Sequence, residues 1–322
     1  MDDMHTQTAL VTGTTSGLGF ETAAQLADRD YSRIIVTGRH EARVADAASR
    51  LTSRTGKDVF ETLVLDLDDM ASVETAATDL AKRGGTIDTL ILNAGIAPPP
   101  NVIMTASGLD ATVTSSLIGH HLLTMRVLEA GLLAEGASIV IAGSEAARGD
   151  VPTFTPVDLH AVANDHFGGD LEKAIENQMR MEAPAKYKAG DTYATAKLFV
   201  AWWAAELSRL LPDGVSVNAV SPGSTPGTDA IRNAPFYMRA FMVPLFKLIP
   251  GMSHSVADGA GRYLEVADYD RDVTGKFFAS KPKKMTGQIE EMRMDHFADQ
   301  DAQRALWNVT SRVAGGVSYP VI

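Results

Sequence analysis

The chain has 322 residues, of which 45% are hydrophobic and 21% are charged, which is the composition of a globular protein with a sizeable core. Its formal charge of -11 argues against broad nucleic-acid binding, because a polyanion would be repelled. The complete absence of cysteine excludes disulfides, thiolate catalysis and zinc–cysteine sites.

The amino-terminal segment MDDMHTQTALVTG does not have the features of a targeting sequence. It is acidic and leads directly into an apolar run, without the basic start and long apolar stretch of a secretory signal. No apolar stretch elsewhere reaches the length that spans a bilayer. We therefore expect a cytoplasmic protein that does not associate with membranes.

Short apolar runs alternate with helical patterns along the first two thirds of the chain. The apolar runs predict strands at 9–13, 33–38, 59–67, 89–95, 138–144 and 215–223, with a further strand at 275–280. Helices are predicted at 17–29, 41–54, 70–83 and 107–134, and from Tyr193 to about Leu211. Strands that alternate with helices in this way form βαβ units, so the predicted fold class is α/β with a doubly wound parallel sheet of about seven strands.

Two segments interrupt the alternation and are interpreted as insertions within a single domain, 1–322. Residues 145–190 are polar and partly helical, whereas 224–254 contain an apolar stretch at 235–252. We interpret the apolar stretch as a lid over a lipophilic substrate. Core packing, a dimer interface and a membrane-surface role stay open for it, although its prolines interrupt any long amphipathic helix.

A glycine-rich loop, TGTTSGLG, follows the first strand and opens the first helix. Glycines allow the backbone to approach a pyrophosphate closely, and the helix amino terminus presents unpaired N–H groups to it. The strand before and the helix after the loop favour a dinucleotide site over a structural turn. The predicted cofactor-binding residues here are Thr12, Gly13, Thr15, Ser16, Gly17, Leu18 and Gly19.

The end of the second strand indicates which dinucleotide is bound. NAD sites usually place an acidic residue there for the ribose 2′-hydroxyl, but this chain has Gly38 followed by Arg39. A guanidinium can pair with a 2′-phosphate, so we predict NADP (NADPH); the alternative is that Arg39 is a surface charge. Residues after the third and fourth strands are expected to line the rest of the cofactor: Asp66, Leu67, Asn93, Ala94 and Gly95.

The segment YATAK places Tyr193 and Lys197 on one face of a predicted helix. A free phenol has a pKa of about 10. A nearby ammonium lowers this pKa, which makes the tyrosine a usable general acid or base. Lys197 could also hold the ribose of the nicotinamide. A lone YxxxK is common on helix surfaces, but Ser144 ends the preceding strand, where it could bond a substrate oxygen.

The segments TGTTSGLG, LNAG, IAGS, YATAK and NAVSPG, in this order, resemble the short-chain dehydrogenase/reductase family. The resemblance implies a Rossmann-type domain with a seven-stranded sheet, assembled as a homodimer or homotetramer. It also implies that Ser144 orients the substrate, Tyr193 is the acid/base, and Lys197 lowers its pKa and binds ribose. The loop near the nicotinamide would contain Pro222, Gly223 and Thr225.

Two departures from the family pattern stand out. SSLIGHHLLT occupies the place where many members have NHLGHFLLT, so the active-site Asn of the family falls on Ser116, or on Ser115 if the alignment slips by one. A serine could hold a water of the proton relay with a shorter reach, or the relay could be weakened. In addition, Ser144 and Tyr193 are 49 positions apart, so 145–190 is expected to form a cap beside the pocket.

Within the family, GHHLLT and TGKFFASKPKKMTGQIEEM resemble the branch that contains retinol dehydrogenases and light-dependent protochlorophyllide reductase. Members of this branch handle large apolar substrates. Because this chain has no cysteine, whereas the chlorophyll-pathway enzyme uses one near its substrate, photochemistry is not expected.

The resulting prediction is hydride transfer between NADP(H) and a carbonyl or alcohol group of a lipophilic substrate, without a metal ion. One alternative is a non-catalytic NADP-binding regulator, which Ser116 would favour, and another is a reductase of a conjugated double bond. The neighbouring His120 and His121 point to different helix faces, so they are interpreted as packing residues and not as metal ligands.

Overall fold

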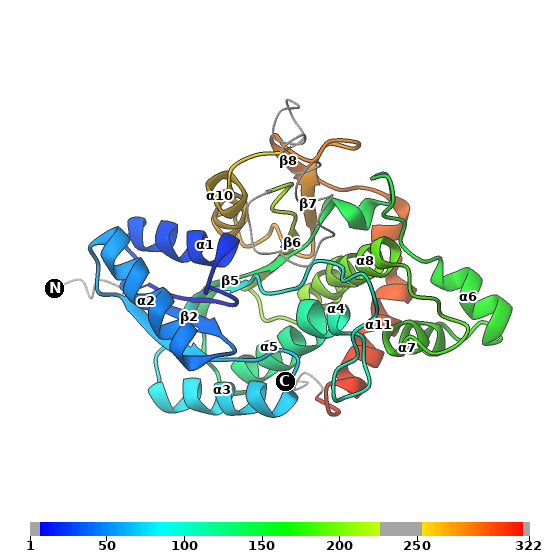
Figure 1. The fold of residues 1–322 in the computed structure, drawn as a ribbon, viewed down its shortest axis with the longest axis horizontal. Helices are drawn as coiled ribbons and strands as arrows, with labels where there is room; N and C mark the ends of the chain where they lie inside the picture. Colours follow the sequence, from blue (N-terminus) through cyan, green and yellow to red (C-terminus); the bar gives the residue numbers. More distant parts are fainter. Residues whose placement is uncertain (1–6, 226–252, 318–322) are drawn as a thin grey trace.

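The computed structural model describes residues 7–225 and 253–317. Over these residues one sheet has eight strands in the order β3-β2-β1-β4-β5-β6-β7-β8 (Figure 1). All neighbouring strands are parallel except β7 and β8. The doubly wound α/β fold is confirmed, and an antiparallel eighth strand extends the sheet beyond the prediction. The strands are β1 (Thr8–Val11), β2 (Arg33–Gly38), β3 (Phe60–Val64), β4 (Ile87–Leu92), β5 (Leu133–Ala142), β6 (Ser216–Val220), β7 (Phe277–Ser280) and β8 (Ile289–Glu291).

Helices connect the strands and cover both faces of the sheet. They are α1 (Gly17–Asp28), α2 (Glu41–Thr55), α3 (Met70–Arg83), α4 (Ala111–Val113), α5 (Gly119–Glu129), α6 (Leu159–His166), α7 (Leu171–Arg180), α8 (Ala189–Ser208), α10 (Val256–Ala267) and α11 (Gln300–Val313). A π-helical turn, η1 (Thr114–Ile118), and two 3₁₀ turns, η2 (Glu145–Arg148) and η5 (Asp295–Phe297), complete the described elements. No helix in this described part of the chain is both long and apolar enough to cross a bilayer.

The boundaries of α3 show how local sequence sets an element. Asp69 caps the helix by accepting a hydrogen bond from the Ala71 amide, and Lys82 and Arg83 lie in the last turn, where the helix dipole favours cations. Gly84 ends the helix with a φ of 68°, which favours glycine. The predicted range 70–83 is therefore confirmed.

The order of the strands creates a crevice in the middle of the sheet. β1 pairs with β2 on one side and with β4 on the other. The chain therefore adds β2 and β3 on one side of β1, and all later strands on the other side. The connections after β1 and β4 then run to opposite sides and leave a gap beyond the carboxyl ends of these strands. This is where the predicted cofactor-binding segments converge.

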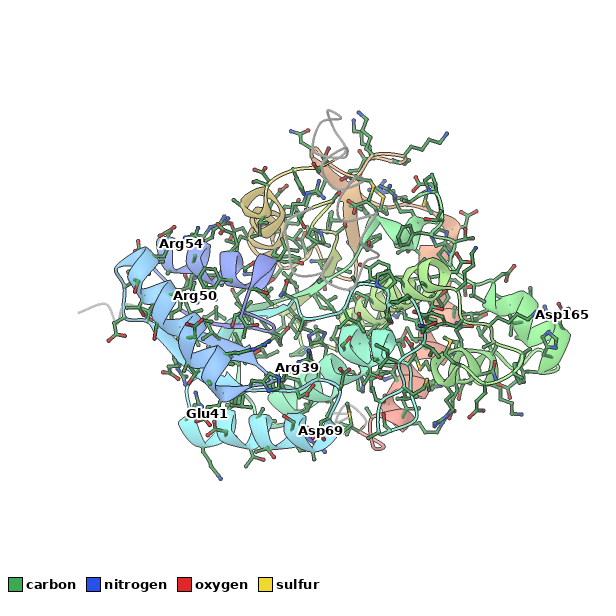
Figure 2. All side chains as sticks on the ribbon, viewed as in Figure 1. Arg39, Glu41, Arg50, Arg54, Asp69 and Asp165 are labelled. Atoms are coloured by element: carbon green, nitrogen blue, oxygen red, sulfur yellow. The ribbon has the colours of Figure 1, made fainter. Side chains whose placement is uncertain are left out.

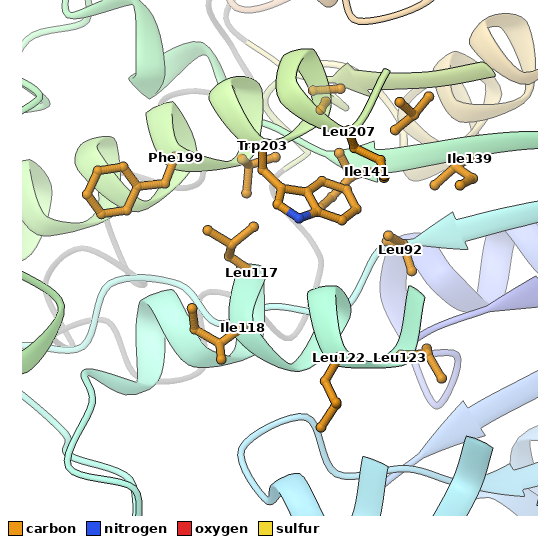
Figure 3. Close-up of a cluster of buried hydrophobic side chains, with 14 of the residues drawn as sticks. Leu92, Leu117, Ile118, Leu122, Leu123, Ile139, Ile141, Phe199, Trp203 and Leu207 are labelled. Atoms are coloured by element: carbon orange, nitrogen blue, oxygen red, sulfur yellow. The ribbon is translucent and has the colours of Figure 1, made fainter. Parts of the chain in front are cut away.

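Two hydrophobic layers fix the helices to the sheet. On one face, side chains of α1, α2 and α10 pack against β1 and β2. On the other face, the larger core joins α3, α5, α8 and α11 to β4 and β5. Figure 3 shows the centre of this core, where Trp203 of α8 lies among Leu92, Leu117 and Ile141.

The helix that carries Tyr193 and Lys197 is buried over most of its length. Every residue from 194 to 207 is buried, in keeping with the apolar sequence around the whole circumference of α8. Its outer side is covered by α11, whose Trp307 stacks on Trp203 with ring centroids 6.5 Å apart. Helix α11 was not predicted from the sequence, although it completes the burial of α8.

The long helix predicted at 107–134 is wrong in its continuity and its end. The structure divides this segment into α4, the π turn η1 and α5, and β5 already begins at Leu133. The hydroxyls of Thr114 and Ser115 donate to the carbonyls of Asp110 and Ala111, at 2.9 and 2.7 Å. Such side-chain bonds compete with the backbone ladder and bend helices, which fits the wider turn at this place.

The insertion at 145–190 contains η2, α6 and α7. Its apolar side chains Leu159, Ile175 and Met179 are buried in the larger core, and α7 packs against α11. Figure 1 shows α6 and α7 at the end of the molecule far from α1 and α2. The predicted lid at 224–254 falls, apart from its ends, on residues 226–252, which lie outside the described residues.

Two leucines near the end of α8 provide a test of this core. Leu207 is fully buried, whereas Leu210 is 36% exposed. Leu207→Ala should lower the free energy of unfolding by about 2–5 kcal/mol, because it leaves a cavity in a packed core. Leu210→Ala should lower it by less than about 1 kcal/mol. Denaturant unfolding measures both, and equal losses would contradict the placement of α8.

Candidate active site

A cavity of about 460 Å³ lies beyond the carboxyl ends of β1 to β4. Its volume is in the range of small-molecule and cofactor sites. It gathers most of the predicted nucleotide-binding residues, namely Gly13, Thr15, Ser16, Gly17, Leu18, Arg39, Asp66, Leu67, Asn93, Ala94 and Gly95. Segments separated by more than 80 residues thus meet at one site.

The glycine-rich loop has a shape that only glycine permits. Gly13 and Gly17 have φ values of 73° and 61°, and a Cβ on Gly19 would lie 2.3 Å from the Gly13 carbonyl oxygen. The Ser16 side chain makes no capping hydrogen bond at the start of α1. The loop and the helix terminus therefore fit the close approach of an anionic group such as a pyrophosphate.

Thr12 supports the loop from behind and does not line the cavity. Its buried hydroxyl accepts a hydrogen bond from the Ala94 amide at 2.9 Å and lies 2.9 Å from Nε2 of His120. Burial lowers the pKa of His120 to about 3, so the ring is neutral at pH 7. Because Nδ1 faces the Ser116 carbonyl at 3.2 Å, Nδ1 carries the proton and Nε2 accepts from Thr12. His120 is thus a polar link in the core, and its packing role agrees with the prediction.

The second of the paired histidines also has protein partners. The indole Nε1 of Trp203 donates to Nδ1 of His121 at 3.0 Å, and burial lowers the pKa of His121 to about 4. Among the described residues there is no group of three or more side chains arranged to hold a metal ion. The two rings therefore contact different neighbours, as expected for adjacent residues that point to different helix faces.

Basic side chains form the rim of the cavity at the end of β2. Arg39, His40 and Arg43 line the rim and are exposed. In Figure 2, Arg39 lies toward the middle of the molecule, whereas Arg50 and Arg54 lie near α1 and α2. The nearby Asp68 was not predicted; burial raises its pKa to about 6, and the charge of Arg39 opposes that rise.

Ser144, Tyr193 and Lys197 come together beside this cavity. Ser144 follows β5, accepts a hydrogen bond from the Ala146 amide at 3.2 Å, and forms a hydrogen bond with the Tyr193 phenol. Lys197 lies one turn along α8, and its Nζ donates to the Ala142 carbonyl at 2.9 Å. The predicted set therefore shares one place at the carboxyl edge of the sheet.

The electrostatics of this set differ from the sequence expectation. Burial raises the pKa of Tyr193, the hydrogen bond from Ser144 lowers it, and the charge of Glu145 raises it further. Burial also lowers the pKa of Lys197 to about 8. The expected lowering of the Tyr193 pKa is therefore not found in this structure, because desolvation outweighs the stabilisation of the phenolate.

Ser116 has an unusual environment for a hydroxyl. Its Oγ is buried and has no hydrogen-bond partner among the described residues. A Cβ on Gly95 would lie 3.3 Å from this oxygen and 3.7 Å from Nζ of Lys197, so the two groups flank Gly95. Ser115, the alternative position, lines the cavity and bonds the Ala111 carbonyl.

A short stretch of the insertion lies against Tyr193. The ring of Phe154 meets the Tyr193 ring edge to face, with centroids 6.0 Å apart. The Val157 amide donates to the Thr195 hydroxyl at 2.9 Å. Residues near 154–157 therefore lie beside Tyr193, whereas α6 and α7 pack away from it.

The predicted nicotinamide loop, which contains Pro222, Gly223 and Thr225, lies near the start of α1. The Gly223 amide donates to Ser221 Oγ at 3.1 Å, and His254 Nε2 lies 2.7 Å from the Pro222 carbonyl oxygen. A Cβ on Gly259 would lie 2.7 Å from Thr225 and 2.9 Å from Leu18, so both loops meet at α10.

Two buried charged residues beneath this region were missed by the sequence analysis. Glu145 and Arg262 are 2% and 4% exposed, and Arg262 Nη1 lies 3.3 Å from Glu145 Oε1. Glu145 follows Ser144 directly, so a charge next to a strand end was a visible signal. Arg262 lies within the amphipathic helix α10, and nothing in the sequence around it indicated a buried charge.

Comparisons with known proteins agree with this geometry. A family model for short chain dehydrogenases matches residues 7–156. Polyprenol dehydrogenase of Mus musculus is 30% identical over 316 residues, which cover 95% of this chain and 83% of the relative. Retinol dehydrogenase 13 of Homo sapiens is 28% identical over 314 residues, covering 96% and 85% of the two chains.

A solved structure has the same fold. The short-chain dehydrogenase from Burkholderia cenocepacia in complex with NADP has a TM-score of 0.60 at 22% identity, and the match covers 86% of this chain and 96% of that chain. The chain belongs to the short-chain dehydrogenase/reductase family, whose members are oxidoreductases that bind nicotinamide cofactors. Within that family it lies in the branch of the retinol dehydrogenases, as the motifs had indicated.

Gly19→Ala tests the glycine-rich loop. The new methyl group would collide with the Gly13 carbonyl and would lie 2.6 Å from Nδ2 of Asn93, so the loop must shift. The affinity for the reduced nicotinamide cofactor should fall at least about tenfold, or ~1.4 kcal/mol, in a fluorescence titration. Gly261→Ala is the control, because its Cβ would meet only Gln25, at 3.9 Å. Native affinity in the Gly19 variant would refute the assignment.

Proposed function

We propose that this protein is an NADP(H)-dependent oxidoreductase that transfers a hydride between NADP(H) and a carbonyl or alcohol group of a lipophilic molecule. The observation that carries the proposal is the group of Ser144, Tyr193 and Lys197 beside a nucleotide-sized cavity. Membership of an oxidoreductase family supports the reaction class.

The preference for NADP rests on the rim at the end of β2. Arg39 stands at the position where an acidic residue would bind a ribose 2′-hydroxyl, and His40 and Arg43 lie beside it. A planar guanidinium can pair with a phosphate through two hydrogen bonds. The NADP named with the Burkholderia cenocepacia structure supports the same cofactor.

In the proposed reduction, the glycine-rich loop and Arg39 would hold NADPH, which would supply a hydride for the carbonyl carbon. The Ser144 hydroxyl donates a hydrogen bond to the carbonyl oxygen and polarises it. The Tyr193 phenol then gives its proton to that oxygen as the alcohol forms. Lys197 holds the ribose and favours the phenolate left behind, and the unpartnered Ser116 hydroxyl holds the water that returns a proton to Tyr193.

A lipophilic substrate is supported by two observations. Phe154 places an apolar ring next to Tyr193. The names of the relatives, polyprenol dehydrogenase and retinol dehydrogenase, refer to long apolar alcohols. Reduction of a lipophilic ketone or aldehyde, or oxidation of the matching alcohol, is therefore the reaction to assay first.

A non-catalytic NADP-binding regulator is the second candidate, favoured by Ser116 at the position of the family's Asn. Such a protein would bind NADPH but would not consume it with any member of a panel of lipophilic ketones and aldehydes. Reduction of a conjugated double bond would instead give a saturated ketone, which product analysis by mass spectrometry and NMR distinguishes from an alcohol.

Tyr193→Phe tests the mechanism. The variant keeps the ring but cannot transfer a proton, so turnover should fall by about 10³-fold, while NADPH binding stays nearly unchanged. NADPH absorbance measures turnover. Tyr269→Phe is the control, because among the described residues that hydroxyl donates a hydrogen bond to Glu265 alone, in an exposed position at α10. Retained turnover in the Tyr193 variant would contradict its proposed role as the proton donor.

Arg39→Ala tests the choice of cofactor. Loss of a charge-assisted contact worth about 1.5–3 kcal/mol should raise the KM for NADPH by about tenfold to a hundredfold. The KM for NADH should change little, since NADH has no 2′-phosphate. Arg54→Ala is the control, because Arg54 pairs with Glu21 at 2.7 Å, outside the cavity. Equal changes for both cofactors would defeat the assignment.

A further inference from the structure

A buried ion pair lies directly behind the proposed catalytic group. Glu145 follows Ser144 in the chain, and Arg262 reaches it from α10 at 3.3 Å. Both side chains are almost completely excluded from solvent. Their neighbours come from the carboxyl ends of β5, β6 and β7, which are the strand ends that face the substrate region.

The carboxylate of Glu145 joins three strand ends. One oxygen accepts hydrogen bonds from the Ser280 hydroxyl, at 3.0 Å, and from the Ser280 amide, at 3.4 Å. The other oxygen accepts from the Ser221 hydroxyl. The same Ser221 oxygen accepts from the Gly223 amide at 3.1 Å, so Ser221 links Glu145 to the nicotinamide loop through two consecutive hydrogen bonds.

Arg262 closes the same network from the other side. Its Nη1 donates to the Ser221 carbonyl at 3.0 Å, and its Nη2 donates to the Ser280 hydroxyl at 2.9 Å and to the Gly287 carbonyl at 2.7 Å. A Cβ on Gly223 would lie 2.8 Å from Nη1, so the guanidinium touches the nicotinamide loop directly.

A pair of this kind needs an explanation other than stability. Removing two charges from water is expensive, and apolar replacements of similar volume often stabilise a fold as well or better. The network instead ties Ser144, through Glu145, to Ser221 and the nicotinamide loop that follows it. These are the two segments whose relative position decides where a substrate oxygen lies against the nicotinamide.

We propose that Glu145 and Arg262 are positioning residues. They hold Ser144 and the nicotinamide loop in a fixed relative position, and their opposite charges keep the net charge near Tyr193 close to zero. The inference rests on the proposed function of Tyr193. Neither residue touches the reacting atoms. Glu145 acts through Ser144 and Ser221, and Arg262 acts through Ser221 and by neutralising Glu145.

The second part of the proposal depends on the charges around Tyr193. The charge of Glu145 raises the pKa of Tyr193. Lys197 lies on the same helix as Tyr193, with its Nζ 5.7 Å from the ring centroid. From α10 and the segment before it, the groups near Arg262 are His254, Asp258 and Glu265, whereas Tyr263 of α10 lies near Tyr193 and Glu145. Burial lowers the pKa of His254, and the buried Arg148 of η2 pairs with Asp150 at 2.9 Å, so among the described residues Arg262 is the cation paired with Glu145.

The test compares Glu145→Gln with the double variant Glu145→Gln/Arg262→Gln. The glutamine keeps an acceptor for Ser221 and Ser280 but leaves Arg262 unbalanced. The Tyr193 pKa should therefore fall by about one unit in the single variant and return close to its native value in the double variant. Tyrosinate absorbance, taken as the difference from the matching Tyr193→Phe variant, reports this pKa without substrate. The pH limb of kcat should move with it.

Two results would overturn the charge-balancing role. One is an unchanged Tyr193 midpoint in Glu145→Gln, and the other is an equal displacement in the single and double variants, as loosened packing alone would produce. The Tyr193 pKa is measured from tyrosinate absorbance without substrate. It can therefore be determined even if Tyr193→Phe retains turnover and the proposed function fails. Arg29→Gln is the charge control, because Arg29 pairs with Asp268 on the surface near α10.

Arg262→Lys tests the positioning role and decides the case if Glu145→Gln does not fold. Lysine keeps the charge but cannot bridge Ser221, Ser280 and Gly287 together. The Tyr193 midpoint should stay at its native value, while the KM for NADPH should rise about tenfold, because the loop at 221–223 loses an anchor. A native KM together with a native midpoint would show that Arg262 does not position the loop.

Discussion

Burial of α8 is the constraint on which the rest of the site depends. Residues 194–207 are enclosed by the sheet, by the π turn η1 and by α11, so Lys197 loses most of its hydration. Desolvation lowers the pKa of this lysine to about 8 and raises that of Tyr193. The helix thus brings both groups to a place where small changes in neighbouring charge have large effects.

Two hydrogen-bond networks hold the segments on either side of this helix. On the cofactor side, His120 joins Thr12 of the glycine-rich loop to the Ser116 carbonyl in the π turn. On the substrate side, Glu145 and Arg262 join the end of β5 to the loop after β6. Strand ends alone would give approximate positions; these buried contacts fix their relative placement.

Features that depend on neighbouring residues in the chain could be predicted from the sequence. The strand at 33–38, the helix at 70–83 and the glycine-rich loop carry their signals in local apolar runs, caps and glycines. Features that depend on distant partners could not. The π turn at Ser116, the cover provided by α11, the edge strand β8 and the direction of the Tyr193 pKa shift all arise from tertiary packing and desolvation.

The packing of α11 on α8 has a consequence for synthesis on the ribosome. Trp307 and Leu306 belong to the same core as Trp203, yet they are translated about a hundred residues later. Until α11 has left the exit tunnel, the outer face of α8 exposes tryptophan and leucine side chains to water. During that interval α8 is an exposed apolar surface of the nascent chain, which is the kind of surface that makes partly folded chains prone to aggregate.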